Sequence, residues 1–150
     1  MEISPFVVWF GTIAAVLAVG LGSMWRAYQG ERPTAALFSE AITLAEPGLG
    51  NLSAEAIAAF QQGLAAFEQE SYRQAAQQWA IATQLAPDCP EIQHNWGLAL
   101  ANLCEEREAA ACLAQAGPHY LERGDLTQSA LVRRHLTAMA NQIESRRALS

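Results

Sequence analysis

The sequence contains no lysine, and charged residues make up only 16% of its 150 residues, against about 25% in an average globular protein. All 9 basic residues are arginines, and the formal net charge is −6. Proteins that bind nucleic acid carry a stripe of basic side chains that replaces the counterions of the phosphates. Because this chain has no such stripe, we expect it not to bind nucleic acid.

The chain also lacks the residue spacings that mark chemistry. Its three cysteines, Cys89, Cys104 and Cys112, have no C-x-x-C spacing, so neither a disulfide framework nor a zinc site is indicated. There is no glycine-rich phosphate loop, no His-Glu-x-x-His and no nucleophile elbow. We therefore expect no enzyme activity, no metal site, no cofactor and no small-molecule substrate.

What the chain does have is one long apolar run. Residues 5–25, PFVVWFGTIAAVLAVGLGSMW, contain no charge and would span about 30 Å as a helix, the thickness of a hydrocarbon core. Trp9 and Trp25 stand near its ends, where tryptophan favours the membrane interface. A cleaved signal peptide is the alternative, but such peptides carry a basic N-terminal region and only Glu2 precedes this run. The pattern predicts an uncleaved transmembrane anchor over residues 1–26.

The residues in and around the run predict its orientation and a contact. Arg26 and Arg32 follow it and no basic residue precedes it, so the positive-inside rule places the N-terminus outside and the C-terminal domain in the cytoplasm. Small residues three or four apart within the run could admit a second transmembrane helix. These residues are Gly11, Ala14, Ala15, Ala18 and Gly22.

Residues 27–52 have the composition of a linker. GERP and EPGLGN are turn-forming stretches, and they flank TAALFSEAITLA at residues 34–45. The apolar spacing of this middle stretch indicates that it could form a short amphipathic helix near the membrane surface.

The remaining residues, 53–147, contain an internal repeat of two units. Gly63 in the first unit corresponds to Gly97 in the second, and Trp79 corresponds to Leu113. Three further pairs at the same offset are identical: Leu64 and Leu98, Ala75 and Ala109, Ala82 and Ala116. Self-similarity at a constant offset of about 34 residues is typical of stacked helical units. No single unit of this kind can bury its apolar face alone.

The apolar spacing within each unit predicts helical hairpins. A first helix over residues 54–68 would have Ile57, Phe60, Leu64 and Phe67 on one face. Further helices should begin where the sequence has the form of a capping box. These places are Ser71 with Gln74, Asp88 with Glu91, and Asp125 with Gln128.

Proline is the other signal in this part of the chain. Pro118 falls inside the fourth helix of the series, where the loss of a backbone donor predicts a stop or a kink. Together with Pro87 and Pro90 it also interrupts the chain too often for a coiled coil, which is the main structural alternative.

These residues resemble the tetratricopeptide repeat (TPR), a helix–turn–helix whose period matches the offset between Gly63 and Gly97. The first unit matches the TPR pattern at Gly63, Tyr72, Ala75, Trp79, Ala82 and Pro87. The second unit keeps Trp96, Gly97, Ala109 and Ala116, but has Leu121 in place of the final proline. The resemblance implies an all-α fold, in which the transmembrane helix is followed by a short TPR-like solenoid of helical hairpins. Residues 124–147 would form a C-terminal capping helix or part of a third repeat.

The resemblance also implies a concave groove that takes a peptide or helix of a partner protein. By motif position, the groove residues would be Phe60, Leu64, Phe67, His94, Leu98 and Asn102. The alternative for some of them is packing between hairpins. TPR domains that bind the acidic tails of chaperones use basic groove residues, and the corresponding positions here hold none. We therefore expect this chain not to bind such tails.

The sequence thus predicts a non-enzymatic, membrane-anchored adaptor that recruits or assembles a protein partner at a membrane complex. Its layout is similar to that of TPR proteins of cyanobacterial and plastid thylakoids that assist photosystem I assembly. Mitochondrial import receptors share the layout, although their linkers are basic. Two alternatives stay open: a structural accessory subunit held through its transmembrane helix, and a periplasmic TPR factor of reversed orientation.

Overall fold

The computed structural model describes residues 36–44 and 52–149. The predicted anchor, residues 1–26, lies outside the described residues, as does most of the predicted linker. Within the described ranges the chain forms five helices and no strand, which confirms the all-α prediction. No helix in this part of the chain combines the length and apolarity needed to cross a membrane. The helices are α3 (Ala54–Glu68), α4 (Tyr72–Leu85), α5 (Pro90–Asn102), α6 (Glu106–Glu122) and α7 (Leu126–Ala148).

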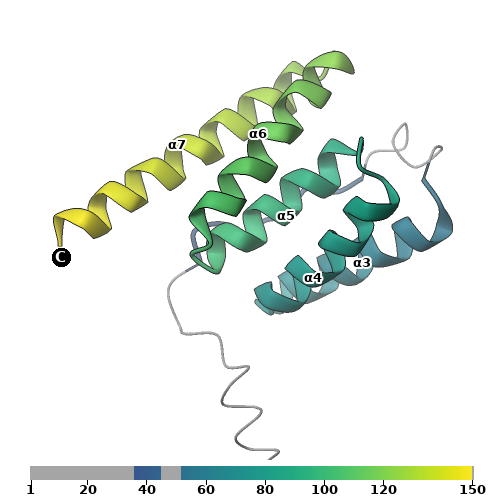
Figure 1. The fold of residues 1–150 in the computed structure, drawn as a ribbon, viewed down its shortest axis with the longest axis horizontal. Coiled ribbons are helices and arrows are strands. Elements are labelled where there is room, and N and C mark those ends of the chain that lie inside the picture. Colours follow the sequence, from purple (N-terminus) through teal and green to yellow (C-terminus); the bar gives the residue numbers. More distant parts are fainter. Residues whose placement is uncertain (1–35, 45–51, 150) are drawn as a thin grey trace, which may run out of the picture. The chain divides into compact units, whose positions relative to one another are not determined.

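Each helix packs on the next one along the chain. The result is two hairpins, α3–α4 and α5–α6, followed by α7 beside α6 (Figure 1). The helix predicted over residues 54–68 is confirmed at both ends. Its first turn is capped by Ser53, whose hydroxyl accepts the N–H of Ala56 at 3.1 Å, as a side chain at this position normally does.

The two hairpins turn in the same way, at equivalent positions of the two repeat units. Glu70 follows α3 and Cys104 follows α5, and both have the left-handed backbone, with φ of 57° and 63°. In both turns the next residue donates its N–H to a carbonyl five residues earlier, at 2.9 Å. This pattern satisfies carbonyls that a helix end would otherwise leave unpaired. The repeat in the sequence is therefore also a repeat in backbone geometry.

A glycine facing a large side chain sets the helix packing within each hairpin. Trp79 is fully buried, and a Cβ placed on Gly63 would lie 2.7 Å from its ring atoms Cδ1 and Cε2. A Cβ on Gly97 would lie 2.8 Å from Leu113 Cγ in the second hairpin. The indole Nε1 of Trp79 donates to the carbonyl of Phe60 at 3.2 Å, so its one polar group is satisfied.

The other repeat-defining residues lie in this core or at its edge. Tyr72 packs edge-on against Phe67, with ring centroids 5.0 Å apart. Trp96 is partly buried, and Pro87 lies in the exposed turn between α4 and α5. The remaining positions are alanines that are fully buried: Ala75, Ala82, Ala109 and Ala116. Small side chains at these points let neighbouring helices approach each other.

Of the three predicted capping boxes, the structure forms one in part. Asp125 accepts the N–H of Gln128 at 3.0 Å at the start of α7. Ser71 stands at the N-cap of α4, but its side chain makes no capping hydrogen bond. Asp88 does not cap α5, because that helix begins at Pro90 after Cys89. Proline suits the first helical position, where the N–H has no partner within the helix.

Pro118 does not end α6, so the predicted stop of this helix is wrong. The helix runs without interruption from Glu106 to Glu122. Proline removes the N–H that would pair with the carbonyl of Ala114. Both Pro118 and Ala114 are exposed, so water can satisfy that carbonyl and the helix tolerates the loss.

Residues 36–44 are extended rather than helical, so the short helix predicted over residues 34–45 does not form in this part. A helix of this length is marginal by itself, because fixing its first turn costs more entropy than one hydrogen bond recovers. The segment runs alongside α5 instead and obtains its hydrogen bonds there (Figure 1).

Candidate functional site

Two asparagines on α5 hold the backbone of the 36–44 segment. Asn102 accepts the N–H of Phe38 through Oδ1 at 2.9 Å and donates from Nδ2 to the carbonyl of Phe38 at 2.8 Å. Asn95 makes the same pair of bonds with Ile42, at 2.6 and 2.7 Å. Each side-chain amide therefore satisfies both backbone groups of one residue, as a neighbouring β-strand would do.

The spacing of these contacts follows from the geometry of the two chains. Residues seven apart on a helix lie on the same side and are separated by about 10.5 Å along the axis. Four residues of fully extended chain cover at most about 13 Å, so a segment slightly short of full extension matches this distance. Because Phe38 pairs with the later asparagine and Ile42 with the earlier one, the segment runs antiparallel to α5. We call the residues that share this side of α5 the α5 face: His94, Asn95, Leu98, Ala101 and Asn102.

Side chains of the segment reach towards α7. Phe38 is 8% exposed, and its ring centroid lies 4.6 Å from that of His135 on α7. Leu37 lines a small surface pocket together with Met139. Glu40, in the middle of the segment, is exposed. The contacts thus combine backbone hydrogen bonds to α5 with apolar contacts to α7.

The structure brings three of the six predicted groove residues together. His94, Leu98 and Asn102 all lie on the α5 face, and all three are buried. Of these, Asn102 contacts the segment directly through its amide. Leu64, on α3, is half-buried and packs at the edge of the core.

The remaining two, Phe60 and Phe67, lie in the core between α3 and α4. They are 1% and 2% exposed, and their ring centroids lie 6.4 and 5.5 Å from that of Trp79. Their helical spacing therefore serves packing within the hairpin. In this structure neither side chain is accessible to a partner.

A histidine pair lies between α5 and α7, next to Phe38. A hydrogen bond of 2.9 Å joins His94 Nε2 and His135 Nδ1, and the ring of His94 also meets that of Tyr120 edge-on at 5.8 Å. Burial, with a further contribution from His135, lowers the pKa of His94 to about 3. Burial also lowers the pKa of His135. Both rings are therefore neutral at pH 7, and the pair offers no positive charge to an acidic ligand.

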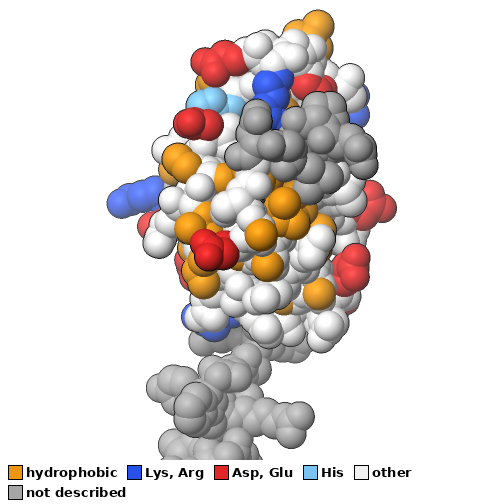
Figure 2. Space-filling view, turned by 90° about the vertical axis from the view of Figure 1, so that its right-hand side faces the viewer, with side chains coloured by type: hydrophobic (Ala, Val, Ile, Leu, Met, Phe, Trp, Pro, Cys, Tyr) orange, Lys and Arg blue, Asp and Glu red, His pale blue; other side chains and the backbone are white. Residues whose placement is uncertain are grey.

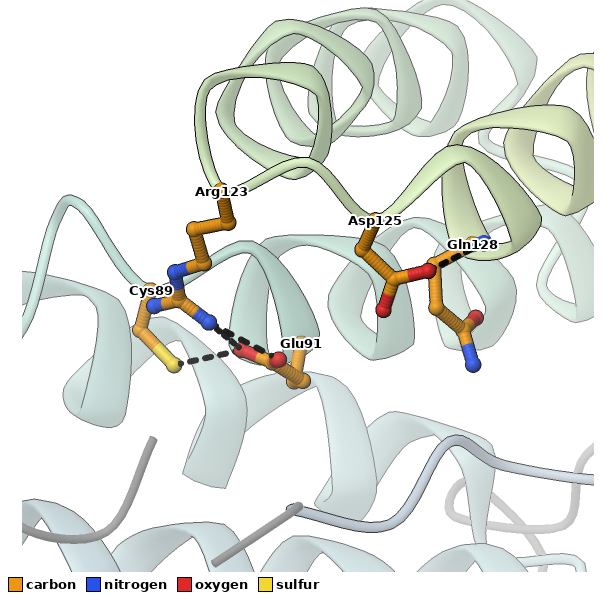
Figure 3. Close-up of polar contacts among 5 residues, drawn as sticks. All are labelled: Cys89, Glu91, Arg123, Asp125 and Gln128. Atoms are coloured by element: carbon orange, nitrogen blue, oxygen red, sulfur yellow. Dashed lines mark hydrogen bonds and ion pairs between the residues drawn. The ribbon is translucent and has the colours of Figure 1, made fainter. Parts of the chain in front are cut away.

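A second polar cluster fixes the start of α5 (Figure 3). The carboxylate of Glu91, a buried residue, accepts from Arg123 Nη1 at 2.9 and 3.0 Å and from Cys89 Sγ at 3.2 Å. Arg123 stands in the turn between α6 and α7, just before the cap residue Asp125. The ion pair therefore ties the first turn of α5 to the turn that positions α7.

The thiol in this cluster is a hydrogen-bond donor and not a nucleophile. Burial raises the pKa of Cys89 to about 11, and the neighbouring Glu91 carboxylate contributes to that increase. A reactive cysteine needs a lowered pKa and an electropositive, accessible setting. The cluster thus supports the position of the α5 face rather than adding chemistry to it.

Sequence reasoning missed two parts of this site. Asn95 was not among the predicted groove residues, although an amide seven residues before Asn102 must lie on the same side of a helix. That spacing is the signal that identifies the pair. The role of residues 36–44 has no local signal, because their partners on α5 are 53 and 64 residues away in the sequence.

The surface elsewhere shows no concentration of positive charge on the side that Figure 2 presents. Apolar side chains gather near the centre of this side, acidic side chains lie around them, and basic side chains stand at separate points. Among the described residues, no group of three or more His, Cys, Asp or Glu side chains is arranged to hold a metal ion. The site is therefore defined by amide hydrogen bonds and apolar contacts.

No family model, no curated protein and no solved structure matches this chain. Over residues 36–44 and 52–149, fold and site together define an all-helical arrangement of two hairpins and a further helix, in which one helix face holds an extended stretch of chain.

Proposed function

We propose that this protein is a membrane-anchored adaptor that binds a protein partner through the α5 face and recruits or assembles it at a membrane complex. The observation that carries the proposal is the double amide contact of Asn95 and Asn102 with an extended backbone. An extended peptide from another protein would present the same N–H and carbonyl groups at the same spacing.

The chemistry of the α5 face supports a peptide ligand rather than a small molecule. Side-chain amides pair with any peptide backbone and so provide affinity, while apolar contacts beside them select side chains. The ring contact of Phe38 with His135 and the surface pocket that Leu37 and Met139 line mark two such places. The resemblance to the TPR family, in which the inner helices line a binding groove, points in the same direction.

The proposal of a membrane anchor is supported by the sequence alone. The uncharged run of residues 5–25, the flanking tryptophans and the following arginines support a single-pass protein with its helical domain in the cytoplasm. The similarity in layout to thylakoid TPR proteins favours a role in the assembly of a photosynthetic membrane complex. The neutral histidine pair beside the α5 face favours a partner segment that is not an acidic tail.

The peptide-binding part of the proposal is tested with a defined probe on the full-length protein. The probe is a fluorescein-labelled peptide of residues 36–44, ALFSEAITL, in an anisotropy titration. The protein carries Phe38→Pro and Ile42→Pro, which remove the backbone N–H groups that Asn102 and Asn95 hold; we call it the released variant. We expect saturable binding, which is lost when Asn95→Ala and Asn102→Ala are added.

Two controls make that titration specific. Asn141→Ala changes an exposed asparagine on α7 and should leave binding unchanged. A scrambled peptide of the same composition should not bind. If the released variant is folded by circular dichroism and the peptide shows no saturable binding, the α5 face is not a peptide-binding surface.

A further inference from the structure

We propose that residues 36–44 act as a built-in competitor, which occupies the α5 face until a partner peptide of similar chemistry displaces them. The proposal rests on the proposed function, because it needs the α5 face to be the partner site. It adds a partner class and a mode of regulation to that function. The partner segment is extended and carries an aliphatic residue followed directly by an aromatic one, as Leu37 and Phe38 do.

The 36–44 segment adds one residue, Phe38, to the hydrophobic core, and Leu37, Ala41 and Leu44 pack against that core from its surface. Phe38 is its one buried residue, and the others are half-buried or exposed. Four of the hydrogen bonds that hold it run between its backbone and two side chains of α5. The packing between the helices themselves, by contrast, depends on fully buried residues such as Trp79 and Leu113. Release of the segment would remove Phe38 from the core but would leave the packing within each hairpin, which rests on Trp79 against Gly63 and Leu113 against Gly97.

The surface that release would uncover suits a peptide. Asn95 is fully buried and Asn102 is 9% exposed, and both would lose their partners if the segment left. Water could pair with the uncovered amides, but the contact of Phe38 with His135 and the burial of the Phe38 ring would be lost, and this loss of buried apolar surface favours a covered face. The face is thus most stable when some extended chain lies on it, whether from the same molecule or from another.

The segment also shows which side chains a competing peptide needs. An aromatic ring at the Phe38 position would pack at a tilt against His135, and an aliphatic residue just before it would line the same surface pocket as Met139, as Leu37 does. The position two residues after the aromatic one, held by Glu40, is exposed and sets no requirement. The peptide would run antiparallel to α5, because the register of the two asparagines fixes its direction.

The loss of apparent peptide affinity that a competing segment of the same chain causes can be estimated. A segment joined to its site by a short connection faces it at an effective concentration of roughly millimolar. A free peptide added at micromolar concentration must then compete with it, and its apparent affinity falls in proportion to the fraction of uncovered sites. We therefore expect the labelled 36–44 peptide to bind the wild-type protein at least ~10-fold more weakly than the released variant.

The test compares three full-length proteins with the same labelled peptide. The matched control carries Ser39→Pro and Thr43→Pro, which place the same number of prolines at exposed positions of the segment and leave the N–H groups of Phe38 and Ile42 in place. We expect tight binding to the released variant and weak binding to both the wild type and the control. Equal affinity for wild type and released variant, with binding still dependent on Asn95 and Asn102, overturns the competitor and leaves the proposed function standing.

Two further outcomes complete the test. No binding to a folded released variant contradicts the proposed function itself. Sedimentation velocity checks whether residues 36–44 lie on the α5 face of their own molecule. A wild-type dimer that becomes a monomer in the released variant would mean that two copies exchange these segments, and would contradict an intramolecular competitor.

Discussion

Gly63 and Trp79 are in such close contact that no larger side chain fits at the glycine. A Cβ there would lie 2.7 Å from ring atoms Cδ1 and Cε2 of the indole, and closer still to Nε1. The indole is fully buried, so it cannot move aside without disturbing α3 and α4. The same relationship recurs in the second repeat unit between Gly97 and Leu113. This contact is what the sequence repeat encodes.

Gly63→Ala should therefore destabilise the domain, although alanine is the better helix former. Overpacking of a filled core costs about 1–3 kcal/mol, which exceeds the gain of up to about 1 kcal/mol from replacing a helical glycine. Gly117→Ala is the comparison, since among residues of other elements a Cβ there meets nothing closer than Val132 Cγ1 at 3.8 Å, although it would lie next to the ring of Pro118. Urea unfolding of the full-length protein should give a lower midpoint for Gly63→Ala than for Gly117→Ala. Equal midpoints would contradict the close contact.

The ion pair of Arg123 with Glu91 should matter more than that of Arg146 with Glu106. The two arginines have side chains that are both 41% exposed, and the pairs have N–O distances of 2.9 and 3.0 Å. The carboxylates differ, with side chains that are 8% and 36% exposed. Arg123→Ala leaves a buried carboxylate with only the Cys89 thiol as a donor and should cost about 1–3 kcal/mol, whereas Arg146→Ala should cost less than about 1 kcal/mol. Chemical denaturation at pH 7 measures both, and a larger loss for Arg146→Ala would refute this assignment.

Stability should fall between pH 7 and pH 5 because of His94. Its folded pKa of about 3 is below the ordinary value of 6.5, so the unfolded chain binds more protons over the pH range between these values. The full stability is thus present above pH 6.5 and decreases as the pH falls towards 3. At pH 5 the loss from His94 alone is about 2 kcal/mol. The groups that face it are His135 and the fully buried Tyr120.

The check is the difference in unfolding free energy between pH 7 and pH 5, for wild type and for His94→Gln. Glutamine cannot titrate, so the variant should lose less stability over this interval, even if it is less stable at pH 7. The same pH dependence in both proteins would show that His94 is not the responsible group.

Pro118→Ala should stabilise α6. The substitution restores a backbone N–H four residues after Ala114 and removes a ring from an exposed position. A proline inside a helix costs roughly 3 kcal/mol relative to alanine when nothing offsets it, so a gain of about 1–3 kcal/mol is expected. Thermal unfolding monitored by circular dichroism measures the melting temperature of the variant. A lower melting temperature than that of the wild type would mean that the proline ring makes a contact that supports the fold.

The hairpins could be predicted from the sequence because their signals are local or periodic. The bounds of α3 follow from its apolar spacing, and the pairing of Gly63 with Trp79 follows from the recurrence of both positions in the second repeat unit. The continuation of α6 through Pro118 could not be predicted, because it depends on the exposure of Ala114, which is a property of the folded helix.

The candidate site was predictable only in part for the same reason. His94, Leu98 and Asn102 share a helix side, which a helical wheel reveals. The extended conformation of residues 36–44 depends on amides of α5 that are distant in the sequence, and tertiary contacts of this kind override local helical preference. Phe60 and Phe67 have the spacing of a groove, but the neighbouring helix α4 places Trp79 against them.

The central claim is that Asn95 and Asn102 hold an extended chain on the α5 face, and amide hydrogen exchange of the full-length protein tests it most directly. The N–H groups of Phe38 and Ile42 should exchange slowly, because each donates to an asparagine. Those of Ser39 and Glu40, in exposed residues of the same segment, should exchange faster. Asn102→Ala should remove the protection of Phe38. Exchange of Phe38 and Ile42 at the rate of an unstructured peptide would contradict the account.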